Sequence, residues 1–373
     1  MDLRLNEDQE MFKKVAADFV QAEAPTTMLT QQFLKKETFL PDLYAKIAGL
    51  GWLGMLMPEQ YGGAGLSYLD CGVVFEELGR APVPGPVFSS GVLAAQIVHD
   101  GGSDAQKQEI LPAICGGDAV VIPAIGDHGA HWGPETVATT CSQSGDTLTL
   151  NGTKRHVYDA EGATAFLCAV GGGDGGVSVV LVERNAPGVT VTPHNGFMVS
   201  VSEVSFDNVQ VPAGNLIGAA GAGWELLDQA AERAIPILCA YKVGACQEIY
   251  EFTVRYTNER RAFGQLIGRF QRVQDHCVEL SIHMDRARMA TYETLWELDE
   301  GMPAEAGIHE SKAAASEGYH QACSYSHMVH AGPGTDYLHP LMVHSVLAHT
   351  LYQYLGTPDY HKRRMVDALY PTT

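Results

Sequence analysis

Long apolar runs and positive charge are both scarce in this 373-residue sequence. No apolar stretch reaches the roughly 18 residues that a membrane-spanning helix needs, and the polar, acidic first residues have no signal-peptide pattern. Lysine and arginine number 24 against 44 acidic residues, which gives a formal charge of −20. This negative charge argues against binding to nucleic acid or to anionic membranes. Clusters of arginine are therefore informative, because an anionic ligand needs local cations.

Cysteine and histidine motifs with metal-binding or redox spacing are also missing. The eight cysteines are scattered and include no Cys-x-x-Cys, which favours a reduced cytoplasmic protein with inert core thiols. The fifteen histidines include no His-Glu-x-x-His pattern. His128 and His131 alone make a weak ligand pair. The sequence therefore predicts no metal site.

The hydrophobic periodicity changes twice along the chain. A single core rarely exceeds about 250–300 residues, so a chain of this length predicts two or three domains. Residues 1–117 have helical spacing, with helices expected from residue 5 and near 40–50, 67–80 and 88–100, and with a glycine-rich loop at 51–65. Residues 118–221 have strand patterning, and residues 222–373 return to the helical period. The sequence thus predicts three domains in the order helices, strands, helices.

The middle segment contains short alternating runs separated by turn residues. We expect a strand at 147–150, a hairpin turn at Asn151-Gly152, and strands at 165–170, 177–182 and 201–212, with a glycine-rich turn at 171–176. Several short strands of this kind predict an antiparallel barrel or sandwich. Helices are expected again at 270–298, 305–330 and 343–354.

The most informative stretch lies between two of these expected helices, at residues 260–271. Two adjacent arginines, Arg260 and Arg261, are followed by Phe263, Gly264 and an amide. Arginine holds phosphate bidentately, and an aromatic ring beside a glycine offers a flat face that another ring can approach. The stretch could hold the pyrophosphate and adenine of a dinucleotide. It could also be a charged helix end that turns into the next helix.

Four segments in this order resemble the acyl-CoA dehydrogenase superfamily: residues 58–65, 150–155, 204–212 and 260–271. The resemblance covers nearly the whole chain. It implies an α+β fold with an N-terminal helical domain, a middle antiparallel β-domain and a C-terminal four-helix bundle. It also implies a flavoprotein that removes an α-proton and a β-hydride from an acyl-CoA thioester, with FAD as hydride acceptor and a glutamate as proton acceptor.

The resemblance also implies roles for particular residues. The flavin of such enzymes lies at a subunit interface, so Arg260 would contact the pyrophosphate of a partner's FAD, and Phe263 and Gln271 would pack on or bond to it. Gly332 would let the backbone approach the same dinucleotide. In the chain's own flavin site, the matching positions are Ile125, Tyr158 and Thr357.

The positions that carry the chemistry match the family less well. Gly126 replaces a residue with a hydroxyl, Met328 replaces a glutamine, and Tyr158 is bulkier than the usual hydroxyl residue, so it could fill the space of the flavin ring or serve as a core tyrosine. Leu355 occupies the position of the usual catalytic glutamate. A leucine cannot accept a proton at any pH.

Another glutamate must therefore serve as base if the chain acts alone. Some relatives carry it on the first helix of the C-terminal bundle beside an arginine, and Glu232 with Arg233 matches that pattern. Between Arg233 and Gly244 this chain has two residues more than those relatives. On a helix, two residues turn a side chain by roughly 200°, enough to point it away from the site. Glu232 could instead be a surface acid paired with Arg233 or Lys242, and Asp228 is a weaker alternative base.

Four hypotheses follow from this pattern. The first is a weakly catalytic or non-catalytic subunit of a heteromeric α₂β₂ acyl-CoA dehydrogenase of the steroid or bulky-acyl type, with a second dehydrogenase subunit as partner. The second is a self-sufficient homo-oligomer that uses Glu232. The third is non-redox acyl-CoA chemistry such as hydration, with His128, His131 or His156 as acid–base groups, and the fourth is a scaffold.

Overall fold

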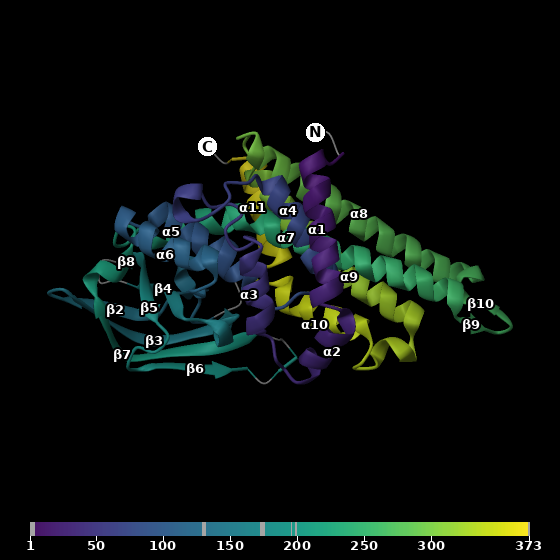
Figure 1. The fold of residues 1–373 in the computed structure, drawn as a ribbon, viewed down its shortest axis with the longest axis horizontal. Coiled ribbons are helices and arrows are strands. Elements are labelled where there is room, and N and C mark those ends of the chain that lie inside the picture. Colours follow the sequence, from purple (N-terminus) through teal and green to yellow (C-terminus); the bar gives the residue numbers. More distant parts are fainter. Residues whose placement is uncertain (1–3, 129–131, 172–175, 195, 198–199, 372–373) are drawn as a thin grey trace. The chain divides into compact units, whose positions relative to one another are not determined.

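The structure is a computed structural model that describes residues 4–128, 132–171, 176–194, 196–197 and 200–371. The chain divides into two compact units, each built from segments that are distant in the sequence (Figure 1). The first, here named the bundle unit, comprises Met1–Glu37, Tyr68–Val83 and Ile235–Thr373. The second, here named the β unit, comprises Thr38–Ser67 and Pro84–Ala234.

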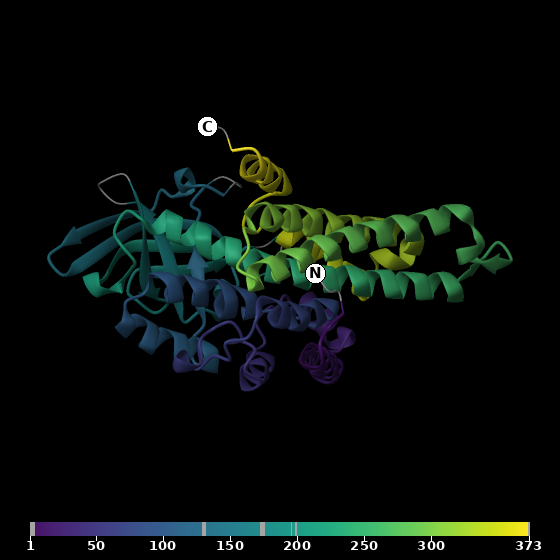
Figure 2. The ribbon, with the colours of Figure 1, turned by 90° about the horizontal axis from the view of Figure 1, so that it is seen from above.

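The bundle unit is built from long helices whose small residues allow close packing. Its core joins four helices, α7 to α10, through apolar side chains such as Ile249, Leu280, Tyr319 and Leu341. In Figure 2 the green and yellow-green helices of this unit run alongside one another. The elements are α1 (Glu7–Glu23), α2 (Thr26–Leu34), α4 (Tyr68–Arg80), most of α7 (Gly223–Glu259), β9 (Arg261–Ala262), β10 (Gln265–Leu266), η6 (Ile267–Arg269), α8 (Gln271–Asp299), α9 (Glu305–His330), η7 (Gly332–Thr335), α10 (Pro340–Tyr352) and α11 (Pro358–Leu369).

Two glycines bring α4 and α7 into backbone contact. A methyl group added at Gly244 of α7 would overlap the carbonyl oxygen of Glu76, and one added at Gly79 of α4 would overlap the carbonyl oxygen of Tyr241. Backbone cannot move aside as a flexible side chain can. Both positions therefore need glycine for packing.

The β unit contains one mixed sheet with short helices beside it. The strand order is β6-β7-β3-β2-β4-β5-β8, and β1 pairs with β4. The strands are β1 (Val121–Ala124), β2 (Thr140–Ser144), β3 (Thr147–Tyr158), β4 (Ala165–Gly171), β5 (Val177–Glu183), β6 (Val189–Pro193), β7 (Val201–Pro212) and β8 (Leu216–Ile217). The other elements are α3 (Pro41–Gly49), η1 (Glu59–Tyr61), η2 (Ser89–Ala94), α5 (Ala95–Gly101), α6 (Asp104–Gly116), η3 (Pro134–Thr136), η4 (Ala160–Gly162) and η5 (Ala213–Asn215).

Two strand predictions need correction. The Asn151-Gly152 pair does not form a hairpin turn, because β3 runs through it and pairs with β7 on both sides, with only a shift of register between Leu150 and Gly152. The hairpin turn instead lies between β2 and β3, at Gly145, which has a φ of 59°. Gly152 is needed for packing instead, since an added methyl group would overlap the Thr139 hydroxyl. The sheet is also not wholly antiparallel, because β4 runs parallel to β1 and to the start of β2.

Most of the expected helices and strands are confirmed. Helix α1 begins with a capping box between Asn6 and Gln9, and α9 spans the expected residues 305–330. Helices α2, α6 and α11 were not predicted, and α6 contains Pro112. The predicted glycine-rich turn at 171–176 falls mainly outside the described residues. In the described part of the chain, no helix is long and apolar enough to cross a membrane.

Candidate functional site

The segment after β1 is fixed by a buried ion pair. The Lys154 ammonium donates to the Ile125 carbonyl and to Asp127 Oδ2, both at 2.7 Å. Asp127 Oδ2 also accepts from the backbone amides of Ala138 at 2.7 Å and Thr139 at 3.1 Å. Burial lowers the pKa of Lys154, and the adjacent Asp127 charge opposes that shift. The carboxylate therefore holds the loop at 125–128 against β3.

An open cavity of about 620 Å³ adjoins this loop. It is lined by Asp127, His128, Ala138, Thr139, Gly152, Thr153, Arg155 and His156. Gly126 lies beside it, and its carbonyl accepts from the Arg155 amide at 2.9 Å. Burial lowers the pKa of His156, and His194 and Arg155 add to that effect. His128 and His156 thus share one cavity, whereas His131 lies outside the described residues.

Tyr158 is the last residue of β3 in the β unit. Burial raises the pKa of its hydroxyl, with a further contribution from Asp159. The next residue, Asp159, accepts a hydrogen bond from Ser89 Oγ at 2.6 Å. The sequence did not point to Asp159 or Ser89. The two residues are 70 positions apart and meet only in the folded chain, so no local motif marks them.

The bundle unit presents the arginine–phenylalanine stretch as an exposed hairpin, here named the arm (Arg260–Gln271). Strands β9 and β10 form its stem, and Phe263 at its turn is 94% exposed with a φ of 50°. The Phe270 ring meets it edge-on at 6.1 Å. Arg260 and Gln271 are exposed beside it. The Phe263 ring and the basic side chains near it are therefore open to solvent.

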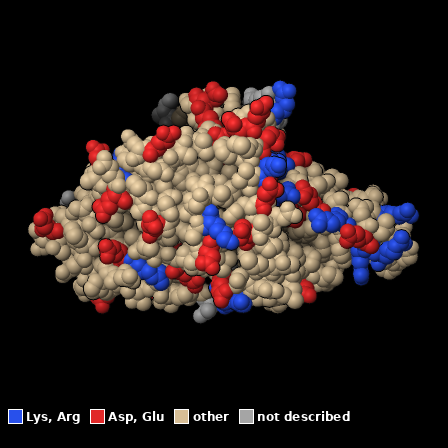
Figure 3. All heavy atoms as spheres, viewed as in Figure 1, with Lys and Arg blue, Asp and Glu red and all other residues tan. Residues whose placement is uncertain are grey.

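The arm is also the most basic part of the visible surface in Figure 3, where blue atoms gather at the end that Figure 1 labels β9 and β10. The exposed cations of this region are Arg255, Arg260, Arg261, Arg269 and Arg272. In a chain of charge −20, such a cluster is suited to an anionic ligand or an acidic protein surface.

The turn after α9 leaves backbone accessible. Ala331 has a φ of 51°, and a methyl group added at the following Gly332 would touch nothing within 4 Å. Met328, one turn earlier, is 59% exposed. This turn has room for a group to approach the backbone closely, while Met328 offers no hydrogen bond.

The position of the usual glutamate is closed. Leu355 is 4% exposed and has a φ of 61°, and its carbonyl accepts from His361 Nε2 at 2.8 Å. The Thr357 hydroxyl caps α11 by accepting from the Tyr360 amide at 3.2 Å. Leu355 is therefore part of the packing, and Thr357 has a structural role whether or not it also meets a cofactor.

Two buried lysines hold the loop that carries Leu355. Lys312 donates to the Gly356 carbonyl at 2.9 Å, and Lys242 donates to the Leu351 carbonyl at 3.0 Å. Both also reach Ser316 Oγ. Burial lowers the pKa of Lys242 to about 8, and burial with the nearby Lys242 charge lowers that of Lys312. Lys242 is thus a buried anchor and not the surface cation considered as a partner for Glu232.

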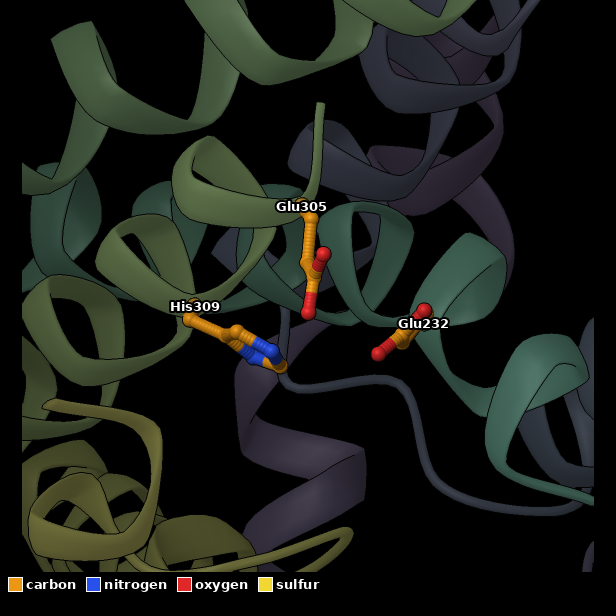
Figure 4. Close-up of side chains that lie close together, drawn as sticks. All are labelled: Glu232, Glu305 and His309. Atoms are coloured by element: carbon orange, nitrogen blue, oxygen red, sulfur yellow. The ribbon is translucent and has the colours of Figure 1, made fainter. Parts of the chain in front are cut away.

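The residues proposed for proton transfer lie on α7. Arg233 pairs with Asp100, and Asp228 accepts from Trp132 Nε1 at 2.7 Å. Figure 4 shows the Glu232 side chain projecting from α7, and Glu305 and His309 one turn apart on α9. Arg233 and Asp228 thus already have ionic or hydrogen-bond partners within the β unit.

Comparison with known proteins identifies the class. Three family descriptions match in sequence: "Acyl-CoA dehydrogenase, N-terminal domain" at residues 6–118, "middle domain" at 126–209 and "C-terminal domain" at 221–370. The chain therefore belongs to the acyl-CoA dehydrogenase family. By that membership it is an FAD-dependent oxidoreductase that acts on CH–CH bonds.

Individual relatives agree with this assignment. The probable acyl-CoA dehydrogenase YngJ of Bacillus subtilis (strain 168) is 28% identical over 346 residues, 90% of each chain. Butyryl-CoA dehydrogenase from Megasphaera elsdenii shares the fold with a TM-score of 0.89 at 23% identity, covering 99% of this chain and 100% of that one. The ChsE4–ChsE5 complex from Mycobacterium tuberculosis gives a TM-score of 0.88 at 24% identity, covering 100% of both chains.

The residues of the bundle unit fit FAD better than the residues of the β unit do. The arm offers guanidinium groups for phosphate and an exposed ring, and the open backbone at Gly332 would accept a dinucleotide. In the β unit, Gly126 has no hydroxyl, and the Ile125 carbonyl is already bonded to Lys154. Tyr158 still supplies a hydroxyl. The residues that would hold the dinucleotide therefore fit FAD better than the residues that would face the flavin ring.

Proposed function

We propose that this chain is a subunit of a heteromeric acyl-CoA dehydrogenase and that its arm completes the FAD site of a partner subunit. The observation that carries the proposal is the contrast between Phe263 and Leu355. The aromatic residue predicted to reach a neighbour's cofactor is 94% exposed, whereas the usual base position holds a leucine that is 4% exposed. The chain therefore has the residues that would contact a partner's FAD but lacks the usual base for its own site.

Each residue of the arm has a physical role in this proposal. Arg260 would neutralise and orient the pyrophosphate, because a guanidinium forms paired hydrogen bonds with phosphate oxygens. Phe263 would lose its exposed surface against the partner, and Gln271 would supply an amide at the start of α8. Gly332 would allow close approach of the backbone. FAD supplies the hydride acceptor when bound, and this chain contributes binding and orientation.

Two further observations support a heteromer. One solved structure with this fold is a complex of two different chains, ChsE4 and ChsE5. The basic arm also differs from the acidic remainder of the chain, so an acidic partner face would complement it. We propose a bulky acyl-CoA of the steroid-degradation type as substrate, and a reducing cytoplasm as the compartment, consistent with the eight free thiols.

The test uses the chain together with a co-encoded acyl-CoA dehydrogenase. We expect Arg260→Ala and Phe263→Ala to lower the ratio of flavin to protein in the purified assembly, because both contacts to the dinucleotide are lost. Arg286→Ala is the control, since Arg286 is also an exposed arginine of α8 but lies outside the basic cluster and faces Glu317 at 3.7 Å, and it should leave the ratio unchanged. Unchanged flavin in both arm variants would exclude the proposed role of the arm.

Self-sufficient catalysis by Glu232 is a second candidate, because Glu232 is only partly buried on α7. In that case Glu232→Gln would retain FAD and lose reduction of the flavin by acyl-CoA. A flavin-free chain that becomes yellow only with its partner would count against this candidate.

A further inference from the structure

Strand β3 contains a bulge that presents two neighbouring side chains to one cavity. The register of β3 against β7 shifts between Lys154 and Val157, so that two residues of β3 lie opposite one residue of β7. These two residues are Arg155 and His156, and His156 has a φ of 54°. Consecutive side chains of a regular strand point to opposite faces, whereas a bulge re-aims them and often lies beside a functional site. Here both side chains are exposed and both line the same cavity.

The cavity beside the bulge has the size and the fixed walls of a small-molecule site. Its volume of about 620 Å³ lies within the range of about 300–1,000 Å³ that is usual for such sites. The walls come from the loop at 127–128, from residues 138–139 and from β3. Asp127 holds all three together, because it accepts from the backbone amides of residues 138–139 and pairs with Lys154 of β3. The walls are therefore in place before a ligand binds.

The ionisable groups of this cavity favour an anion. Among the described residues that line it, Asp127 is the only acid, and the Lys154 ammonium offsets its charge at 2.7 Å. The other ionisable groups of the lining are Arg155, His128 and His156. In a chain with a formal charge of −20, a cavity with this lining is suited to a negatively charged ligand.

The groups around the bulge disfavour further positive charge. The imidazole of His194 lies 5.6 Å from that of His156, measured between ring centres. Burial lowers the pKa of His156, and His194 and Arg155 add to that effect. Glu203 Oε2 approaches Arg155 Nε at 4.0 Å, which is too far for a hydrogen bond. An anion in the cavity would offset this repulsion.

We propose that this cavity binds the phosphate monoester group of a small molecule, with Arg155 and His156 as its main ligands and His128 as a third. A phosphate monoester carries nearly two negative charges at neutral pH and has three strong acceptor oxygens. A guanidinium binds two of these oxygens in parallel, and an imidazole can donate to another. The two histidines then serve in binding, and not in the acid–base chemistry considered from the sequence. The inference goes beyond the proposed function, because it concerns the β unit and not the arm.

Two sources carry this group: the 3′-phosphate of coenzyme A, on which the substrates of the family are carried, and inorganic phosphate. Their shared chemistry is the monoester dianion. Acetyl-CoA and its 3′-dephospho analogue separate the two sources, because the analogue lacks the monoester and keeps the pyrophosphate. FAD also has a pyrophosphate and no monoester, so the site should remain available when FAD is bound.

The test is protection of histidine side chains from acylation by diethylpyrocarbonate at pH 7, mapped by mass spectrometry. The reagent attacks neutral imidazole, and His156 is mostly neutral at that pH because its pKa is lowered from the ordinary value. The chain is purified with a co-encoded dehydrogenase and saturated with FAD, and the peptides of this chain are followed. His99, whose side chain is 39% exposed in the same unit, is the internal control.

We expect inorganic phosphate to slow acylation of His156 and not of His99, whereas sodium chloride at equal ionic strength has no effect. Arg155→Gln should raise the phosphate concentration for half protection about tenfold, as for loss of one charge-assisted hydrogen bond. His156→Asn keeps a side chain that tolerates the left-handed backbone and should weaken protection of His128. Lys46→Gln removes an exposed cation of α3 and should behave like the wild type.

Protection by acetyl-CoA at about tenfold lower concentration than by its 3′-dephospho analogue would identify coenzyme A as the source. Protection by phosphate and by neither acetyl-CoA form would identify inorganic phosphate. Equal protection by the two acetyl-CoA forms would overturn the proposal, and so would the absence of protection by phosphate or wild-type protection in Arg155→Gln. The flavin content of the arm variants tests the proposed function separately.

Discussion

At the residue scale, Leu355, at the position where the family resemblance places the catalytic glutamate, is a packing residue. Its side chain is buried, and its carbonyl and that of Gly356 are held by His361 and Lys312. The left-handed backbone of Leu355 is therefore retained by its surroundings even though no proton chemistry is possible there.

This interpretation predicts a stability effect without a chemical one. Leu355→Ala should lower the free energy of unfolding by about 2–5 kcal/mol, the usual range for a buried leucine, and should leave bound flavin unchanged. Leu338→Ala is the control, because Leu338 is 64% exposed and its loss should have little effect. Thermal unfolding with the flavin spectrum recorded in parallel measures both. A loss of flavin with unchanged stability would contradict it.

The Asp127–Lys154 pair makes a second prediction at this scale. Lys154→Met leaves the buried Asp127 carboxylate without its cation, which typically costs about 3–5 kcal/mol. Arg155→Met is the matched control in the same strand, because Arg155 is exposed and its guanidinium lies 4.0 Å from Glu203. Urea unfolding of the two variants should separate them clearly. Equal midpoints would mean that the ion pair does not hold the loop at 125–128.

At the scale of the element, the contact of α4 with α7 depends on glycine. Gly244→Ala places a methyl group on the Glu76 carbonyl, so the helices must separate, and we expect a loss of about 1–3 kcal/mol as for other overpacked sites. Gly49→Ala in α3 has nothing within 4 Å and should be neutral or stabilising. Thermal denaturation that shows Gly244→Ala to be as stable as Gly49→Ala would refute the close approach.

The imidazoles of α9, α10 and α11 predict acid sensitivity. Burial lowers the pKa of His344 to about 3 and that of His361 to about 2, and it also lowers the pKa of His330. Since the folded state favours the neutral forms, their stabilising effect is complete above about pH 6.5 and is lost as the pH falls toward the folded values. Each group contributes about 1.4 kcal/mol per pH unit in that window.

The measurement is urea unfolding between pH 7.5 and 4.5. His344 Nδ1 and the Tyr319 hydroxyl share a hydrogen bond at 3.0 Å, and His344→Gln keeps a hydrogen-bonding group while removing the titrating one. The variant should lose less stability on acidification than the wild type. Parallel pH profiles of the two proteins would show that His344 does not titrate on unfolding.

The elements differ in how far the sequence predicted them. The order of helices, strands and helices followed from periodicity, and α9 was predicted with its observed ends. The Asn151-Gly152 turn was wrong because a strong local turn signal lies within a strand that pairs on both sides with β7. Helix α6 was missed because Pro112 lies in its interior. Tertiary pairing decided these cases, and local propensity did not.

The candidate site was predictable to a similar extent. The arm stood out because arginine, phenylalanine and glycine are adjacent in sequence. Asp159 and Ser89 did not, because a hydrogen bond between residues 70 positions apart leaves no local pattern. The roles of Ile125, Glu232 and Thr357 remain predictions, and the structure adds that Thr357 also caps α11.

At the scale of the whole molecule, the positions expected to bind FAD fit their roles better than the positions expected to carry the chemistry. Family membership covers both units, yet the exposed arm, the closed Leu355 position and Gly126 differ in how well they keep the family pattern. The heteromer that we propose would account for this difference, because a partner could supply the flavin-ring contacts while this chain supplies the arm.

The most direct test is the absorbance spectrum of the purified chain, recorded once alone and once after co-expression with a co-encoded acyl-CoA dehydrogenase. We predict that the chain alone is poorly soluble or free of flavin. Together with its partner it should form a yellow assembly, whose flavin bands bleach when acyl-CoA is added. A stable, yellow, active homo-oligomer of this chain alone would contradict the proposal.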